Sequence, residues 1–295
     1  MLVLQLSCAA ILALFVVMRV SRDPAPARVL RRLALLAVAS WLGEDSCIHL
    51  YHYYFYSPDW SLQIDQVPLL IPLIWPVVIL SASDLAGFIS RVNNRSTHLL
   101  TIPLLGAAIV LADASLIEPI AVASGLWTWT APGLFAVPLI GIVGWSCFAG
   151  AAMAVFDRED RRAAPRPRHE ALVLVIAPLA THALILGTWW GLFRWTPGLI
   201  APWPVVAIAW TLSIALAVHA WRTAVRRRIP AIFMWLRVPA AGFFFVLLAL
   251  HGRGIAPLVA YALAFAPPYL AMTAWPSRRV GSHRADLLAD PAPRP

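Results

Sequence analysis

The chain has 295 residues, of which 61% are apolar and only 13% are charged. A soluble domain of this size carries about 25% charged residues, so the composition excludes an ordinary soluble globular protein. Arginine is the only strongly basic residue type in a chain whose net charge is +9, and such a charge first suggests a nucleic-acid partner. Three cysteines scattered through apolar segments form neither a disulfide framework nor a metal-ligand spacing.

Nine apolar segments follow one another along the chain. Each has few or no charges and is about 20 residues long, the length that a helix needs to cross a bilayer. The predicted spans are residues 2–20, 30–54, 67–90, 99–123, 135–156, 170–193, 199–221, 231–251 and 255–275. We therefore expect an all-α, polytopic transmembrane helix bundle with a single domain over 1–275, located in the inner (cytoplasmic) membrane of a bacterium. Residues 276–295 are polar and proline-rich, which predicts a disordered tail.

The loops between these spans alternate in their arginine content. The arginine-rich loops are 21–32, 91–98, 157–169 and 222–229, and the arginine-poor loops are 55–66, 124–134, 194–198 and 252–254. Because arginine-rich loops stay on the cytoplasmic side, the N-terminus is predicted to lie outside and the C-terminus inside. This distribution explains the positive net charge, so no nucleic-acid partner is predicted.

The second predicted span ends in a polar cluster. Glu44 and Asp45 are followed by His49, His52 and a run of tyrosines up to Tyr56. At about 100° per residue, Asp45, His49 and His52 share one face of a helix. A charge in the middle of a membrane helix costs at least about 2.5–3.5 kcal/mol, so the acids are expected to face the bundle interior. The tyrosines fit an aromatic belt at the outer interface.

The fourth predicted span carries two acids, Asp113 and Glu118. Their spacing puts them on different faces of a regular helix. The next residue, Pro119, removes a backbone donor, and a kink there would bring both acids to one cavity. We therefore expect a polar pocket shared by the second and fourth spans, with Glu44, Asp45, Asp113 and Glu118 around it.

Four kinds of role fit such a pocket. A carboxylic acid kept protonated by apolar surroundings can donate a proton to a lipid-soluble substrate. Asp45, His49 and His52, with an acid from the fourth span, are a weaker candidate for metal binding, since they contain only one H-x-x-H spacing. A proton or ion relay would indicate a transporter, and a purely structural network would lock the helices together. These alternatives stay open from the residues alone; we predict no metal and no cofactor.

The run from Asp113 to Trp145 has a recognisable order: D-x4-E-P-I-A-x3-G-x-W-x-W, then P-G-x-x-A-V-P, then G-W. It resembles the membrane carotenoid-biosynthesis family that includes the bisanhydrobacterioruberin-type carotenoid hydratases. Upstream, Glu44, the tyrosine run and the stretch "VPLLIPLIW" match that family more loosely, so the resemblance covers roughly residues 41–156. The chain departs from the family pattern at Glu118, where the family has Asp, and at Gly141, where it has Asn.

The resemblance implies an enzyme that acts on a hydrophobic isoprenoid or carotenoid substrate in the membrane lipid. The family's hydratases are understood to add water across an isolated terminal double bond. Asp113 or Glu44 is then the expected proton donor, with Glu118 and Asp45 as its partners and His49 as a proton shuttle. The expected substrate-binding residues are His52, Tyr53, Trp75, Trp127, Trp129 and Trp145. Cyclisation or isomerisation is the close variant, and a transporter or non-catalytic membrane protein is the alternative.

Overall fold

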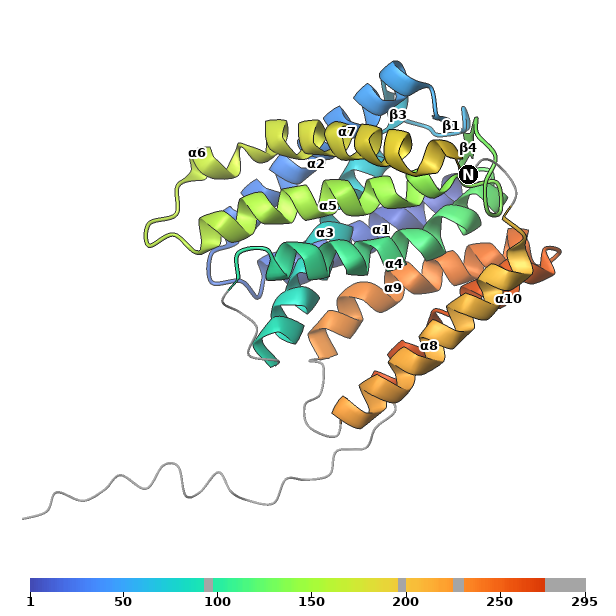
Figure 1. Ribbon diagram of the computed structural model, residues 1–295. Coiled ribbons are helices and arrows are strands. Elements are labelled where there is room, and N and C mark those ends of the chain that lie inside the picture. Colours follow the sequence, from blue (N-terminus) through green and yellow to red (C-terminus); the bar gives the residue numbers. More distant parts are fainter. Residues whose placement is uncertain (93–97, 196–199, 225–230, 274–295) are drawn as a thin grey trace, which may run out of the picture.

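The computed structural model describes residues 1–92, 98–195, 200–224 and 231–273. Helices dominate these ranges (Figure 1). The longer helices are α1 (Leu2–Val20), α2 (Pro26–Tyr51), α3 (Leu70–Val92), α4 (Thr101–Ala123), α5 (Leu139–Asp160), α7 (Val173–Gly191), α8 (Pro202–Ala224) and α9 (Ala231–Leu247). The shorter elements are α6 (Pro167–Glu170), α10 (Ala256–Leu263), α11 (Ala266–Thr273), a 3-10 turn at Phe193–Trp195 and a π-helical turn at Leu248–Gly252. The strands are β1 (Tyr54–Tyr56), β2 (Gln63–Ile64), β3 (Val67–Pro68) and β4 (Trp127–Trp129).

The predicted polytopic helix bundle is confirmed. Within the described ranges, eight helices are long and apolar enough to cross a membrane, so the chain is an integral membrane protein. The ninth predicted span, 255–275, is instead divided into α10 and α11. Pro267 and Pro268 explain the division, because a proline disfavours helical backbone in the residue before it and cannot donate to the preceding turn. The predicted tail, 276–295, lies outside the described residues, and the orientation in the membrane stays a prediction.

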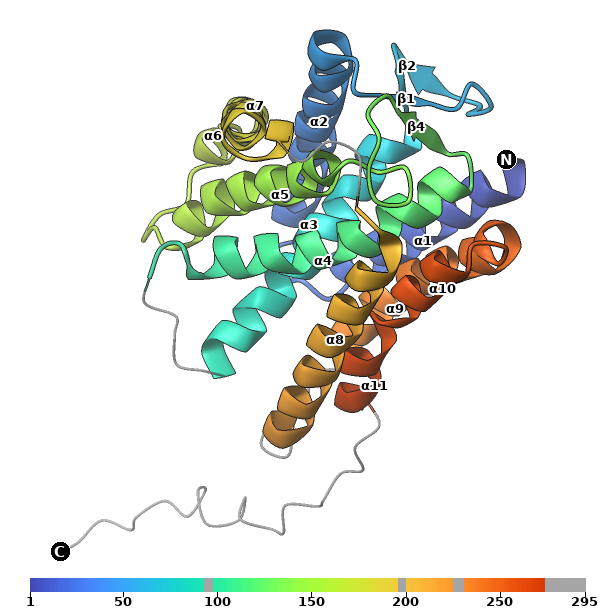
Figure 2. The same cartoon turned by 45° about the vertical axis from the view of Figure 1, so that its right-hand side comes forward.

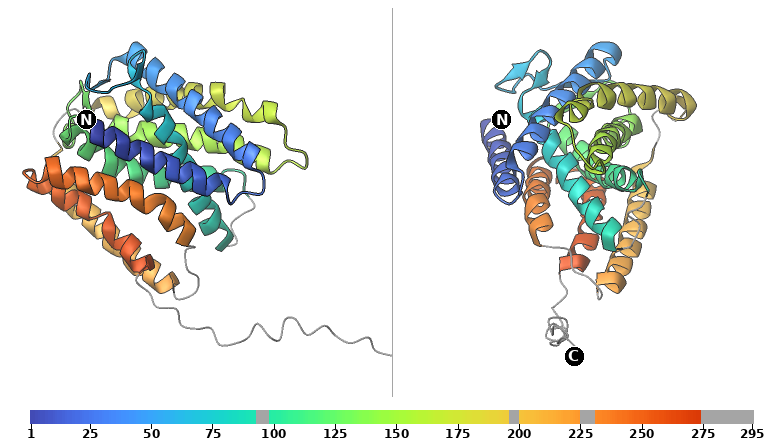
Figure 3. Two further views of the ribbon diagram at one scale, coloured as in Figure 1. Left: turned by 180° about the vertical axis from the view of Figure 1, so that it is seen from behind. Right: turned by 90° about the vertical axis from the view of Figure 1, so that its left-hand side faces the viewer.

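The core lies where α2, α3, α4, α5 and α7 pack together. Its most deeply buried side chains come from all five helices: Leu36, Ile79, Val110, Met153 and Val173. Helices α4 and α5 approach closely because Gly106 faces Met153; a Cβ at that glycine would lie 2.1 Å from the methionine Sδ. On the other side, α1 lies between α2 and α9 (Figure 3), and α8 packs with α10 and α11 at the edge of the bundle (Figure 2).

A small two-stranded sheet, β1–β4, covers the end of the bundle near the N-terminus (Figures 1 and 2). The strands are antiparallel, with Tyr54 opposite Trp129 and Tyr56 opposite Trp127. Because side chains alternate along a strand, these four aromatic residues share the face that packs on the helices. The intervening Phe55 is 46% exposed on the other face.

This sheet corrects the prediction that the second helix continues to residue 54. Helix α2 ends at Tyr51, and His52 follows with φ +52°, in the left-handed conformation that often terminates helices. The chain then turns into β1. His52 is therefore not on a helical face with Asp45 and His49, as the periodicity predicted.

Helix α6 and the start of α2 lie at the opposite end of the bundle (Figure 1), and charged residues of the two elements pair there. Glu170 of α6 is only 1% exposed and accepts hydrogen bonds from three arginines of α2. These are Arg28, Arg31 and Arg32, whose Nε atoms lie 2.8–2.9 Å from the carboxylate oxygens. The ion-pair cluster ties the polar connection between α5 and α7 to α2.

Candidate functional site

A cavity of about 150 Å³ lies between the helices and the β1–β4 sheet. Its wall is apolar and aromatic apart from a few polar groups, and the prominent ones are the carboxyl groups of Glu44 on α2 and Glu118 on α4. A pocket shared by the second and fourth predicted spans is therefore present, with two of the four predicted acids on its wall. Of the predicted aromatic residues, Tyr53, Trp75, Trp127, Trp129 and Trp145 all line it.

The carboxyl group of Glu44 is held by three aromatic donors. The Tyr56 hydroxyl donates to Oε2 at 3.0 Å, and the Tyr54 hydroxyl donates to the same oxygen. The Trp75 indole Nε1 donates to Oε1 at 2.8 Å. Two of these donors belong to β1 and one to α3, so the sheet and the bundle together fix the position of Glu44.

The carboxyl group of Glu118 has a matching but chemically different set of partners. Trp127 and Trp129 of β4 donate from Nε1 to Oε2 at 2.9 and 3.0 Å. Trp145 of α5 donates from Nε1 to Oε1 at 2.7 Å. Glu118 is 2% exposed, so these indoles replace the water that a carboxylate at the protein surface would bind. The W-x-W spacing of the sequence places two of these donors on one face of β4.

The two carboxyl clusters share one aromatic wall. The rings of Trp75 and Trp145, one from each cluster, have centroids 4.5 Å apart. Across the sheet, the ring centroids of Tyr54 and Trp129 lie 4.8 Å apart, and those of Tyr56 and Trp127 lie 5.9 Å apart. The two clusters are therefore in direct packing contact.

The β1 tyrosines remain hydrogen-bond donors over the working pH range. Burial raises the pKa of both the Tyr54 and Tyr56 hydroxyls well above the ordinary value, and the nearby charge of Glu44 raises it further. Both phenols therefore keep their protons.

Asp113 does not share this cavity, which corrects the sequence prediction. Its carboxylate pairs with Arg237 of α9, and that guanidinium also donates to the Ser81 Oγ at 3.1 Å. Helix α4 continues through Pro119 as far as Ala123. Asp113 and Glu118 therefore stay on different faces, and the kink expected to bring them together does not do so.

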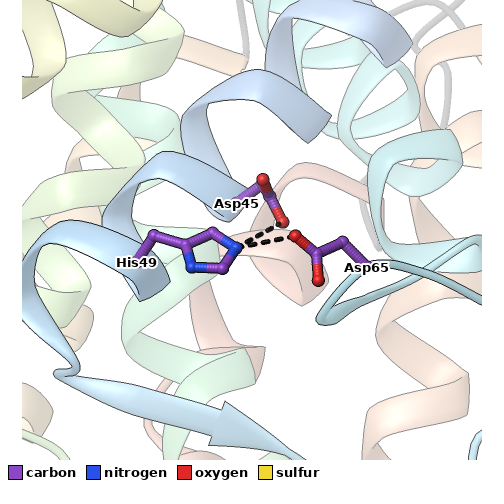
Figure 4. Close-up of side chains that lie close together, drawn as sticks. All are labelled: Asp45, His49 and Asp65. Carbon is purple, nitrogen blue, oxygen red and sulfur yellow. Dashed lines mark hydrogen bonds and ion pairs between the residues drawn. The ribbon is translucent and has the colours of Figure 1, made fainter.

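Asp45 and His49 form a separate cluster outside the cavity wall (Figure 4). The His49 Nε2 lies 2.7 Å from Asp65 Oδ2 and 3.9 Å from Asp45 Oδ1. Successive helical residues point about 100° apart, so Glu44 faces inward while Asp45 faces the 57–69 loop. The prediction that Asp45 would join the shared pocket is therefore wrong.

The same cluster changes the candidate metal ligands. Ligand atoms of Asp45, His49 and Asp65 lie within 4.8 Å of one another, so this group could hold a metal ion. Asp65, from the loop before β3, takes the place predicted for His52. The His52 carbonyl instead accepts a hydrogen bond from the Thr130 hydroxyl at 3.0 Å.

Several partners were not predicted from the sequence. Tyr54 and Tyr56 were assigned to an aromatic belt, and Asp65 and Arg237 were assigned no role. The Y-x-Y spacing, read together with the later W-x-W, is a local signal for two short strands that present aromatic residues on one face. Nothing near Arg237 in the sequence identifies Asp113 as its partner, because 124 residues separate them.

Together, the fold and the cavity define an integral membrane helix bundle with two carboxyl groups, one buried and one half-buried, on one aromatic cavity. The sequence profile of the family described as carotenoid biosynthesis protein matches residues 2–214. The chain belongs to this family, and membership indicates a role in carotenoid metabolism. A comparison with curated proteins and one with solved structures found no match. Helix α9, which supplies Phe243 and Phe244 to the cavity wall, lies beyond the matched residues.

Proposed function

We propose that this protein is an enzyme that adds water to a double bond at the end of a carotenoid or related isoprenoid. The observation that carries the proposal is the pair of glutamates, the buried Glu118 and the half-buried Glu44, on one aromatic-lined cavity. A carboxylic acid shielded from bulk water is suited to protonating an alkene, and the cation that follows needs negative or aromatic surroundings. The cavity offers each of these.

The small volume of the cavity favours binding of only the end of a long substrate. Drug-sized ligands occupy pockets of roughly 300–1,000 Å³, whereas this cavity measures about 150 Å³. A dry apolar cavity of about 150 Å³ holds a molecule the size of benzene. One terminal isoprene unit fits such a space, and the rest of a long polyene would have to lie outside it.

The reaction is a balanced addition. The π electrons of the terminal double bond take the proton of a carboxylic acid and form a C–H bond, leaving a tertiary cation and a carboxylate. A lone pair of water forms the new C–O bond, and the proton that this water releases returns to the carboxylate. Without water, attack by an internal double bond and loss of a proton would give cyclisation, so access of water decides between the two outcomes.

In this proposal Asp113, Asp45 and His49 are not catalytic, because each has contacts outside the cavity. Asp113 is engaged by Arg237, and the remaining two lie in the Asp45–His49–Asp65 cluster. We therefore propose Glu44 and Glu118 as the catalytic carboxyl groups, while Tyr53, Trp75 and Trp145 line the pocket for the substrate end.

Expression in a host that accumulates linear carotenoids tests the proposal. Lipid extracts should contain a new product heavier than the substrate by one water molecule, and heavy-oxygen water should label it. The variant Asp59→Asn, which changes an exposed loop acid, serves as a control and should give the same product. An unchanged carotenoid profile with normally inserted protein would contradict enzymatic action on this substrate class, and a product of unchanged mass would indicate cyclisation or isomerisation instead.

A further inference from the structure

The two carboxyl groups of the cavity differ in the chemistry of their donors. Glu118 is bound by the indole N–H groups of Trp127, Trp129 and Trp145. Glu44 is bound by one indole and by the hydroxyls of Tyr54 and Tyr56. An indole N–H can only donate, whereas a phenol O–H can both donate and accept.

This difference decides which carboxyl group can carry a proton. A protonated carboxyl needs an acceptor for its own O–H. At Glu44, either tyrosine can rotate its hydroxyl and accept that proton, so the hydrogen bonds survive a change of charge. The three indoles described at Glu118 cannot reverse direction, and donors of this kind favour the ionised form of the group that they bind.

The shared cavity adds a second argument. Two carboxylates in apolar surroundings repel each other, so ionising both is disfavoured and one proton is retained by the pair. The donor sets then assign that proton to Glu44. Resting on the proposed function, we infer that Glu44 transfers the proton to the substrate while Glu118 stays a fixed carboxylate that stabilises the cation.

The tyrosines follow as positioning residues for Glu44. In the step itself, the Glu44 O–H bond breaks as the alkene π electrons form the C–H bond. The Tyr54 and Tyr56 hydroxyls turn to donate to the new carboxylate. When water adds to the cation, its proton returns to Glu44 and the hydroxyls turn back. Glu118 begins and ends the cycle ionised, so the atoms and charges balance.

Infrared difference spectroscopy on the purified, substrate-free protein tests this assignment. The carbonyl band of a protonated carboxyl group, which shifts in heavy water, should be present in the natural protein. Glu44→Gln should remove that band while leaving the carboxylate band of Glu118, and Glu118→Gln should remove that carboxylate band. Persistence of the protonated band in Glu44→Gln, or its absence from the natural protein, would overturn the assignment.

Two matched pairs of variants separate positioning from general structure. Tyr54→Phe should shift the Glu44 carbonyl band. The control is Tyr51→Phe, which should not shift it, because the Tyr51 hydroxyl lies 2.9 Å from His182 Nδ1. Trp145→Phe should shift the Glu118 carboxylate band. The control is Trp41→Phe, which should not shift it, because the Trp41 indole donates to the Ile64 carbonyl. Equal shifts in test and control would overturn the positioning roles.

These spectra need no substrate. A protein with the expected bands but no hydration product would contradict the proposed function alone, and a hydrating protein with the reverse bands would contradict the division of roles alone.

Discussion

Two buried glutamates at opposite ends of the bundle have almost the same exposure but hydrogen-bond donors of different charge. Glu170 is 1% exposed and Glu118 is 2% exposed. Glu170 accepts from three arginines, and Glu118 accepts from three tryptophans. The arginines supply full positive charges, whereas the indoles supply only dipoles.

The comparison indicates what each glutamate can do. A carboxylate surrounded by guanidinium groups is already neutralised, so it contributes to stability and has little attraction left for a further cation. A carboxylate held by indoles keeps its negative charge unbalanced in apolar surroundings, where electrostatic interactions are strong. The first arrangement holds helices together, and the second suits a site in which positive charge develops during a reaction.

The largest expected effect comes from the cavity carboxyl groups. Glu44→Gln and Glu118→Gln keep the shape of each side chain but remove the acid proton or the negative charge. Proton transfer by a placed group is worth about 10²–10⁴-fold, so hydration turnover should fall by that order in Glu44→Gln. Turnover by quantified protein in lipid vesicles checks this. Full activity in both variants would rule out the two-glutamate mechanism.

At the other end of the bundle, Glu170→Gln should change stability and spare the chemistry. Removing one partner of a fully buried ion pair costs about 3–5 kcal/mol, and the cost here should be smaller because the Arg28 and Arg31 side chains are 31% and 35% exposed. We expect a clear drop in the unfolding temperature in detergent, with near-normal turnover in the protein that remains folded. A large loss of turnover without loss of stability would break the contrast between the two ends.

A glycine next to the Trp129 ring tests the indole shell without touching a carboxyl group. A Cβ on Gly141 would lie 2.5 Å from that ring, so Gly141→Ala should displace the indole from Glu118. A hydrogen bond to a charged group contributes about 1.5–3 kcal/mol, which corresponds to roughly a tenfold or greater loss of turnover. The matched control is Gly187→Ala on α7, where an added Cβ meets open space; equal losses in both would refute the positioning argument.

The same contrast shows what the sequence could predict. Hydropathy predicts the spans because only helices and closed barrels satisfy backbone groups in lipid. The cost of burying an acid then predicts that Glu44 and Glu118 face inward. The tryptophans Trp127 and Trp129 were predicted as pocket residues through their motif. These features depend on local pattern or on the membrane alone.

The remaining features depend on contacts between distant segments. Strand β1 has only three residues, too few for an alternating pattern to be distinguished from the end of a helix. Its pairing with β4, which turns Tyr54 toward Glu44, is set by tertiary packing. Asp113 was misassigned for the same reason: its inward position was predicted, but its arginine partner comes from α9, beyond any local signal.

Asp113→Asn should therefore have a smaller effect on chemistry than the cavity variants. The change leaves the buried Arg237 facing a neutral amide, although the Ser81 hydroxyl is still within its reach. We expect a lower unfolding temperature and turnover that stays within about tenfold of normal once corrected for folded protein, the size of a modest 1.4 kcal/mol effect. A loss as large as that of Glu44→Gln, at unchanged stability, would restore Asp113 as the proton donor.

The smallest effect is expected at the Asp45–His49–Asp65 cluster. The His49 side chain is 46% exposed and the Asp65 side chain 51% exposed, and surface substitutions usually change stability by no more than about 0.5 kcal/mol. If the cluster only ties the 57–69 loop to α2, His49→Ala should leave turnover within about twofold of normal once corrected for folded protein, because so small a change in stability leaves the protein folded. Elemental analysis of the purified protein should then find no stoichiometric metal, and a chelator should leave the hydration rate unchanged. Should His49→Ala abolish both activity and a bound metal, the cluster would be a metal centre, and the carboxyl groups of the cavity would have to be reassigned as its partners.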